Sequence, residues 1–219
     1  MLFRSFYVAG ELQDSSLQAN SVLRRLSASA RFLGFPGSAI LGTSAYLAGR
    51  IGDMPRLAAI GLHGTEAIIV SYTVVWAGKN LIGRARPDQD PDDPFNFALG
   101  RGFRRGDPFE SLPSGHTAAA FAAAAAVTAE TREIWPAATP LLGPILYTGA
   151  FVVGVSRIYH NRHWASDVVT GAAIGTFSGL KVVKYHYGRR DNLLDRWLLP
   201  TAVLPAAGGL LLVWAIPAR

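Results

Sequence analysis

Apolar segments long enough to cross a lipid bilayer recur along this 219-residue chain, and no other feature of the sequence constrains its fold as strongly. A helix that spans a bilayer needs roughly 20 mostly apolar residues, and about 17 to 25 are tolerated. Six segments are candidates: residues 32–49, 57–78, 112–129, 134–156, 168–183 and 197–218. We therefore predict an all-α fold, a polytopic membrane bundle of about six transmembrane helices.

Composition agrees with a membrane protein. Hydrophobic residues make up 50% of the chain and charged residues 16%, against roughly 25% charged in soluble domains. Cysteine is absent, which excludes disulfides, thiolate zinc sites and cysteine nucleophiles. The net charge of +6 could indicate nucleic acid, but no basic run with interleaved aromatic residues is present. A membrane protein with an anionic substrate is the better interpretation.

Two of the apolar segments are weak candidates, and the first residues stand apart from all six. Segment 168–183 is short and contains Lys181, whose amine could reach the membrane interface from a helix end. Segment 112–129 is mostly alanine and resembles a buried soluble helix almost as closely. Residues 1–31 are predicted to form an amphipathic or partly ordered N-terminal segment before a membrane domain at 32–219, with a solvated cap as the alternative. They do not resemble a secretory signal peptide.

Three clusters of polar residues lie where apolar segments end. Lys79 and Arg86-Pro87 follow the second segment, Pro113-Ser114-Gly115-His116 opens the third, and Ser156-Arg157 with His163 and Asp167 joins the fourth to the fifth. Each cluster has an ordinary explanation on its own. Cations anchor helix ends at the interface, serine caps helices, and a His–Asp pair can simply close a helix.

The same clusters also suit phosphate chemistry. Backbone N–H groups at a helix N-terminus hold an oxyanion, and the Ser114 hydroxyl adds a donor. His116 could protonate a leaving oxygen, because imidazole titrates near neutrality. His163 and Asp167 are four residues apart and would share one face of a helix. A carboxylate bonded to one ring nitrogen would leave the other nitrogen free to attack.

In sequence order, the three clusters have the patterns K-x6-R-P, P-S-G-H and S-R-x5-H-x3-D. This pattern resembles the three-part signature of the type-2 phosphatidic acid phosphatase (PAP2) superfamily, specifically its membrane-bound lipid phosphatase branch. The resemblance implies that His163 attacks phosphorus to form a phosphohistidine, Asp167 orients it and His116 protonates the leaving group. It implies phosphate binding by Lys79, Arg86, Ser114, Gly115 and Arg157. No metal and no cofactor are implied.

The implied function is hydrolysis of a phosphate monoester or diphosphate on a membrane lipid. Phosphatidic acid, phosphatidylglycerol phosphate, polyprenyl diphosphates and lipid A are candidate substrates. An acid phosphatase for soluble substrates, a lipid phosphotransferase, a vanadate-dependent haloperoxidase-like enzyme and a scaffold with an inactive site remain as alternatives. We expect no nucleic-acid partner, and the oligomeric state stays open. Family members usually have three spans before the first motif and one after the last, whereas this chain has two and two.

Charge also predicts an orientation in the membrane. Residues 181–196 carry five lysines and arginines and lie opposite the motifs, so the positive-inside rule places them in the cytoplasm. The active site would then lie at one membrane face, pointing to the periplasm from a bacterial inner membrane.

Several ionisable residues are not part of the signature. His63 and Glu66 lie inside the second apolar segment, three residues apart, and are expected to pair with each other. His160 and Arg162 are expected at the rim of the site. The acidic run that begins at Asp88 lies in the long 84–111 loop and is expected to be solvated rather than to bind a metal.

Overall fold

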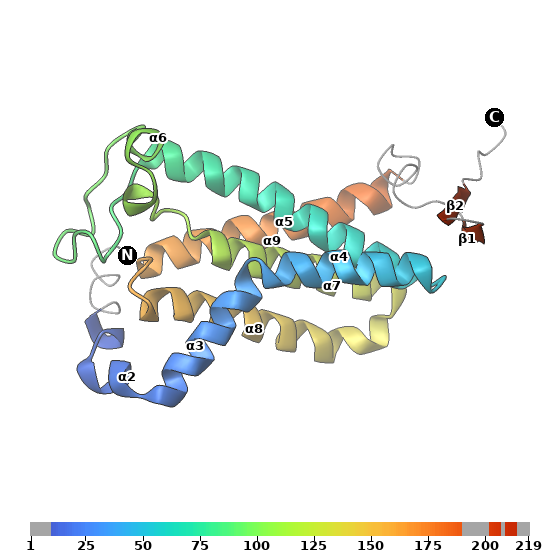
Figure 1. The fold of residues 1–219 in the computed structure, drawn as a ribbon, viewed down its shortest axis with the longest axis horizontal. Helices are drawn as coiled ribbons and strands as arrows, with labels where there is room; N and C mark the ends of the chain where they lie inside the picture. Colours follow the sequence, from blue (N-terminus) through green and yellow to red (C-terminus); the bar gives the residue numbers. More distant parts are fainter. Residues whose placement is uncertain (1–9, 190–201, 207–208, 214–219) are drawn as a thin grey trace.

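A computed structural model describes residues 10–189, 202–206 and 209–213 (Figure 1). The helices are α2 (Ser15–Ala19), α3 (Ser21–Gly34), α4 (Gly37–Ile51), α5 (Pro55–Ile82), α6 (Arg101–Arg105), α7 (Gly115–Ile134), α8 (Thr139–Tyr159) and α9 (Ala165–Gly188). Short 3-10 turns, η1 (Asp107–Phe109) and η2 (Pro136–Ala138), precede α7 and α8. The predicted helical fold is confirmed for this body of the protein.

The alanine-rich helix α7 lies at the centre of the bundle, in contact with α5, α8 and α9 (Figure 1). Its residues Ala118, Ala122 and Ala125 are fully buried. A Cβ placed on Gly175 of α9 would lie 2.2 Å from the carbonyl oxygen of Ala118, so only glycine permits this approach. The weak hydrophobicity of segment 112–129 therefore reflects close packing against neighbouring helices.

The outer faces of the bundle are strongly apolar. Two helices in the described residues are long and apolar enough to cross a membrane, Pro55–Ile82 and Pro136–Tyr159, with mean hydropathy 1.4 and 1.5. Large side chains point outward, among them Phe151 and Phe177, which are 62% and 63% exposed. Exposed apolar surface of this kind marks contact with a membrane or a partner. Six transmembrane helices are not confirmed.

Two predicted spans differ from the structure. The first, 32–49, is divided between two helices: residues 32–34 end α3 and α4 begins at Gly37, because Pro36 lacks an N–H group and Phe35 before it is extended. In the last, 197–218, the described residues form antiparallel strands β1 (Ala202–Ala206) and β2 (Gly209–Val213), so a continuous helix there is wrong. Proline and glycine have the lowest helix propensities of all residue types, so Pro205 and Gly209 explain the difference.

One end of the bundle gathers all three motifs (Figure 1). Helices α5 and α8 finish there and helices α7 and α9 begin there, while the 84–111 loop covers the same end. Helix α3 packs against α7 and α8. The side chain of Gln13 donates to the carbonyl oxygens of Ile158 and Tyr159 at 3.0 and 3.1 Å, which fastens the N-terminal helices to the end of α8.

Candidate active site

The first motif lies where α5 ends. Lys79 is in the last turn, and Gly83 terminates the helix in the left-handed conformation with φ of 60°. A Cβ at Gly83 would lie 2.2 Å from the carbonyl oxygen of Ala98, so the position requires glycine. The turn sends the chain across the end of the bundle and buries Arg86, which is 5% exposed.

The second motif forms the N-terminus of α7. Ser114 occupies the N-cap position and is fully buried, but its side chain makes no capping hydrogen bond. Its hydroxyl lies 2.9 Å from that of Thr117, and its N–H donates to the carbonyl oxygen of Asp167 at 3.0 Å. The position of a Cβ on Gly115 is 3.8 Å from Cε of Lys79. The first amides of α7 and the Lys79 amine can therefore serve one anion.

His163 lies in the short connection between α8 and α9 and is 2% exposed. Its Nδ1 is 2.7 Å from the carbonyl oxygen of Ser111, and its Nε2 is 3.3 Å from Nη1 of Arg86. A carbonyl can only accept, so Nδ1 carries the proton and Nε2 keeps its lone pair. The ring nitrogen that keeps its lone pair therefore faces the guanidinium of Arg86.

Asp167 supports the site differently from the expected pairing. Its Oδ2 is 3.8 Å from Nδ1 of His163, too far for a hydrogen bond. That oxygen instead accepts from the Ser111 hydroxyl at 2.6 Å and the Trp164 N–H at 2.9 Å, while Oδ1 pairs with Arg84. The expected shared helix face does not exist, because His163 precedes the start of α9. Ser111 connects the two side chains.

Three cations lie around the His163 ring. Burial first, and then the charges of Lys79, Arg86 and Arg157, hold the pKa of His163 well below its usual value. The Lys79 amine donates to the Glu110 carbonyl. Arg157 is 5% exposed, and its Nε and Nη1 have no hydrogen-bond partner in the described structure. A neutral imidazole among buried cations suits attack on a phosphoryl group.

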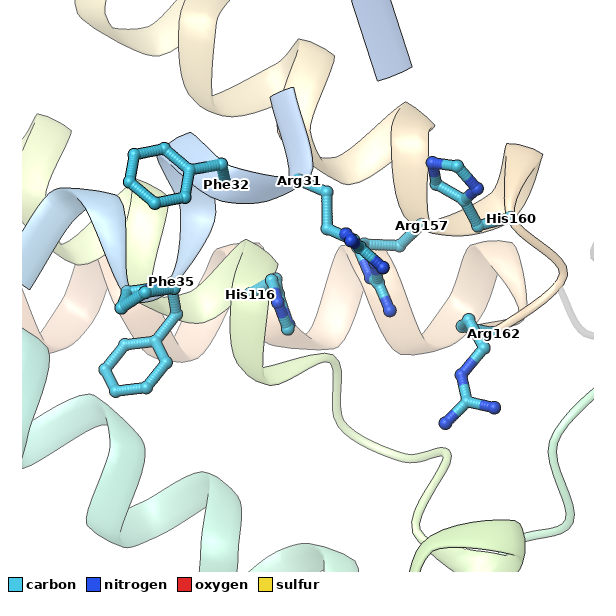
Figure 2. Close-up of a pocket in the computed structure, with 8 residues that line it drawn as sticks. Arg31, Phe32, Phe35, His116, Arg157, His160 and Arg162 are labelled. Atoms are coloured by element: carbon cyan, nitrogen blue, oxygen red, sulfur yellow. The ribbon is translucent and has the colours of Figure 1, made fainter. Parts of the chain in front are cut away.

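A cavity of about 520 Å³ opens beside these residues (Figure 2). It is lined by Arg31, Phe32, Phe35, Pro36, His116, Arg157, His160 and Arg162. In Figure 2, Arg31 and Arg157 lie close together between His116 and His160, with the two phenylalanines beyond His116. The cavity therefore has an apolar wall and a cationic wall that meet at His116.

The eight residues predicted for the site thus lie at one end of the bundle, on the ends of α5, α7, α8 and α9 and on the segments that connect them. The PAP2 superfamily matches residues 61–191, more than half of the chain and all three motifs. The chain belongs to the PAP2 superfamily.

Curated relatives of the chain carry a consistent name. A Porphyromonas gingivalis protein named lipid A 1-phosphatase is 41% identical over 106 residues, 48% of this chain and 19% of that protein. A Rhizobium etli protein of the same name is 36% identical over 165 residues, 64% of this chain and 63% of the relative. The chain therefore spans less than two thirds of the length of these relatives.

A solved structure has the same fold. The crystal structure of Aquifex aeolicus LpxE aligns with a TM-score of 0.58 over 82% of this chain and 94% of that one. The sequences are 22% identical, so this likeness concerns the fold alone.

Sequence reasoning missed two residues of this PAP2 site. Arg84 and Ser111 are both fully buried, and each contacts Asp167. Arg84 also lies over the ring of Trp164, whose indole N–H donates to the carbonyl of Ala85 at 3.1 Å. A second arginine two positions before Arg86 was the available signal for Arg84. No sequence signal identifies Ser111, because its contact to His163 uses the main chain.

Arg162 lies at the PAP2 cavity, as expected of a rim residue. It pairs with Asp88 at 2.9 Å and with Asp107. Burial alone would raise the pKa of Asp107, but Arg86 and Arg162 together hold it below its usual value. Asp88 is therefore an ion-pair partner rather than a freely solvated group.

His63 and Glu66 do not pair with each other. His63 Nδ1 is 2.9 Å from Glu130 of α7, and Glu66 is 2.6 Å from Nε2 of His186 in α9. The two histidine rings stack with centroids 4.0 Å apart. These contacts join α5, α7 and α9 at the end opposite the PAP2 motifs, and the expected pairing within one helix is wrong because both side chains point to neighbouring helices.

Proposed function

We propose that this protein hydrolyses a phosphate ester on a membrane lipid, without a metal, through attack by His163. The observation that carries the proposal is the state of the His163 ring. Nδ1 is occupied by the Ser111 carbonyl at 2.7 Å, and Nε2 faces Arg86 at 3.3 Å in a buried, cationic setting. A neutral imidazole held in this tautomer is a ready nucleophile for phosphorus.

The reaction proceeds in two balanced steps. Nε2 of His163 forms a bond to phosphorus as the bond to the leaving oxygen breaks, and His116, which takes up a proton when the phosphate dianion binds beside it, gives that proton to the leaving oxygen. Water then attacks the phosphohistidine, His116 takes the water proton, and inorganic phosphate leaves with His163 restored. Buried cations and the amides at the start of α7 stabilise the charge on the phosphoryl oxygens in both steps.

The lipid character of the substrate is supported by the surroundings of the site. Phe32, Phe35 and Pro36 give the cavity an apolar wall, and the outer faces of the bundle are apolar. The relatives named lipid A 1-phosphatase make a lipid A 1-phosphate the first candidate. Lys181, Lys184 and Arg189 lie at the opposite end of α9, which favours a periplasmic site in a bacterial inner membrane.

The test is phosphate release by the full chain, purified in detergent, from lipid A, phosphatidic acid and phosphatidylglycerol phosphate. We expect turnover of at least one lipid, and a loss of at least about 1,000-fold in His163→Ala. A chelator should leave turnover unchanged, since cationic side chains take the place of a metal. Arg25→Gln, on the exposed side of α3, is the control. Undiminished turnover in His163→Ala would contradict the proposal.

A further inference from the structure

A second cavity lies between the ends of α7 and α9, at the end of the bundle opposite the motifs (Figure 1). Nearer the motifs the two helices are in close contact, because Gly171, Gly175 and Gly179 recur every four residues on α9. A Cβ on any of them would lie 2.2 to 2.6 Å from a main-chain carbonyl oxygen of residues 114–122. The next residue in this series is Val183, whose side chain holds the helices further apart than glycine does. The cavity of about 530 Å³ opens at Val183.

The lining of this cavity is partly apolar and partly charged. Ala129, Leu180 and Val183 form an apolar wall. Three charged residues also line the cavity, and all three are exposed: Arg132, Glu133 and Lys184. No ion pair of these three residues is found in the part of the chain that the structure describes. Two cations and one carboxylate leave one positive charge, which matches a ligand with a single negative charge.

Arg132 and Lys184 lie at a similar depth in the bundle. Arg132 follows Gly115 in α7, and Lys184 follows Asp167 in α9, by the same number of residues. At about 1.5 Å per residue, each cation is roughly 25 Å along its helix from the motifs. The hydrocarbon core of a bilayer is about 30 Å thick. With the motifs at one membrane face, both cations therefore lie near the lipid headgroups of the opposite leaflet.

One face of α9 continues from the cavity towards the middle of the bundle. Phe177, Leu180 and Lys184 are spaced three and four residues apart, so they share one side of the helix. Phe177 and Leu180 are 63% and 49% exposed. An apolar strip that ends in a cation can hold an acyl chain together with an anionic headgroup, and basic pockets between membrane helices bind such headgroups. A soluble anion would use only the cations.

We propose that Arg132 and Lys184 bind the phosphate of an anionic phospholipid from the leaflet opposite the motifs, with an acyl chain along Leu180 and Phe177. A lipid with one phosphodiester, such as phosphatidylglycerol, has the charge that the cavity requires. This lipid is a bound ligand rather than a substrate, because it lies at the far end of the bundle from His163. It stabilises the protein by joining the ends of α7 and α9. The inference requires that the bundle spans a membrane, but it does not require hydrolysis at His163.

Thermal unfolding of the full chain in detergent micelles tests this site. The micelles contain either dioleoyl phosphatidylglycerol or the same mole fraction of dioleoyl phosphatidylcholine, whose choline group cancels the phosphate charge. We expect the unfolding temperature to be higher by about 3 °C or more with phosphatidylglycerol. Glycerophosphoglycerol, the same headgroup without acyl chains, should not reproduce the part of this difference that depends on Lys184. Equal unfolding temperatures with the two lipids, or full reproduction by the headgroup alone, would overturn the inference.

Substitutions locate the bound lipid. Arg132→Gln and Lys184→Gln should each remove most of the difference between the two lipids, whereas Glu133→Gln should enlarge it, because a carboxylate opposes anion binding. Arg56→Gln is the matched control, since Arg56 is an exposed cation at the start of α5, at the same end of the bundle, and does not line the cavity. It should keep the wild-type difference. Equal effects of Lys184→Gln and Arg56→Gln would overturn the inference.

A variant at the motif end separates this cavity from the active site. Arg157→Gln removes a cation beside His163 and should keep the difference between the two lipids. Loss of the difference in Arg157→Gln but not in Lys184→Gln would place the lipid at the active site and overturn the inference. Because each variant is compared with itself in two lipids, a general loss of stability does not mimic the expected result. None of these measurements uses phosphate release, so their failure would leave the proposed function unaffected.

Discussion

His163 donates through Nδ1 to the main-chain carbonyl of Ser111 at 2.7 Å. The main chain therefore fixes the tautomer of the His163 ring, and substitution of the Ser111 side chain leaves this contact possible. Asp167 lies 3.8 Å from the same nitrogen and is connected to it through the Ser111 hydroxyl, which donates to Oδ2 at 2.6 Å. Asp167 thus holds the segment that holds the ring, and its charge lies near enough to favour the cationic phosphohistidine that we propose.

Ser111→Ala tests this indirect connection. It removes the donor to Asp167 but keeps the carbonyl, so we expect kcat to fall about tenfold with little change in KM, because Ser111 is not among the groups proposed to hold phosphate. Ser111→Thr restores a hydroxyl and should recover part of the rate. Steady-state kinetics on one lipid phosphate measures both constants. A lower unfolding temperature with unchanged kcat would mean that the contact is structural only.

Arg84→Met tests the buried ion pair between Arg84 and Asp167. Arg84 and Asp167 are both fully buried, so the substitution leaves a carboxylate in the core without its cation. Loss of one partner of such a pair lowers the free energy of unfolding by about 3–5 kcal/mol. Denaturant unfolding in detergent measures the loss, and Arg104→Met on the exposed side of the same loop is the control. Equal stability of the two variants would show that the pair contributes little.

Activity should persist in acid. Burial, with Lys79, Arg86 and Arg157, holds the pKa of His163 well below its usual 6.5, so the imidazole of the free enzyme stays neutral near neutral pH. The acid limb of kcat/KM that belongs to His163 should lie well below its usual 6.5. An acid limb of kcat/KM at the usual histidine value of 6.5 would contradict the buried, cationic setting of His163.

The same pKa shift has a defined effect on stability. As pH falls below 6.5, the unfolded chain takes up a proton at His163 while the folded protein does not, so the free energy of unfolding decreases until the folded-state pKa is reached. Between about pH 7.5 and about pH 5.5 the wild type should therefore lose more thermal stability than His163→Asn. Parallel curves for the two proteins would indicate an unshifted histidine.

His63→Leu separates stability from catalysis. His63 pairs with Glu130 at 2.9 Å, at the end of the bundle opposite the motifs, and Glu130 also accepts from the Tyr187 hydroxyl at 2.8 Å. Loss of one buried partner should lower the free energy of unfolding by about 1–3 kcal/mol. The kcat of the folded enzyme should stay unchanged. A large fall in kcat at full stability would instead connect this cluster to the active site.

The helical core and the assembly of the three motifs followed from the sequence, because apolar segment length fixes the helices and their connections place residues 79, 116 and 163 at one end. Partners across helices could not be predicted, since spacing reports only neighbours on one helix. His63 therefore finds Glu130 rather than Glu66. The contact of His163 with the Ser111 carbonyl could not be predicted either, because every residue type has a main-chain carbonyl. Hydropathy alone predicted a membrane-spanning helix for residues 197–218, where Pro205 and Gly209 disfavour a helix.

The central claim is that phosphorus bonds to His163 during turnover, and trapping that bond tests it most directly. The full chain in detergent is mixed with a 32P-labelled lipid phosphate and quenched within the first turnover. We predict label on the wild-type protein that is stable in base and labile in acid, as expected for a phosphohistidine, located on the peptide that contains His163. No label should appear on His163→Ala. Label on another residue, or normal turnover by His163→Ala, would contradict the account.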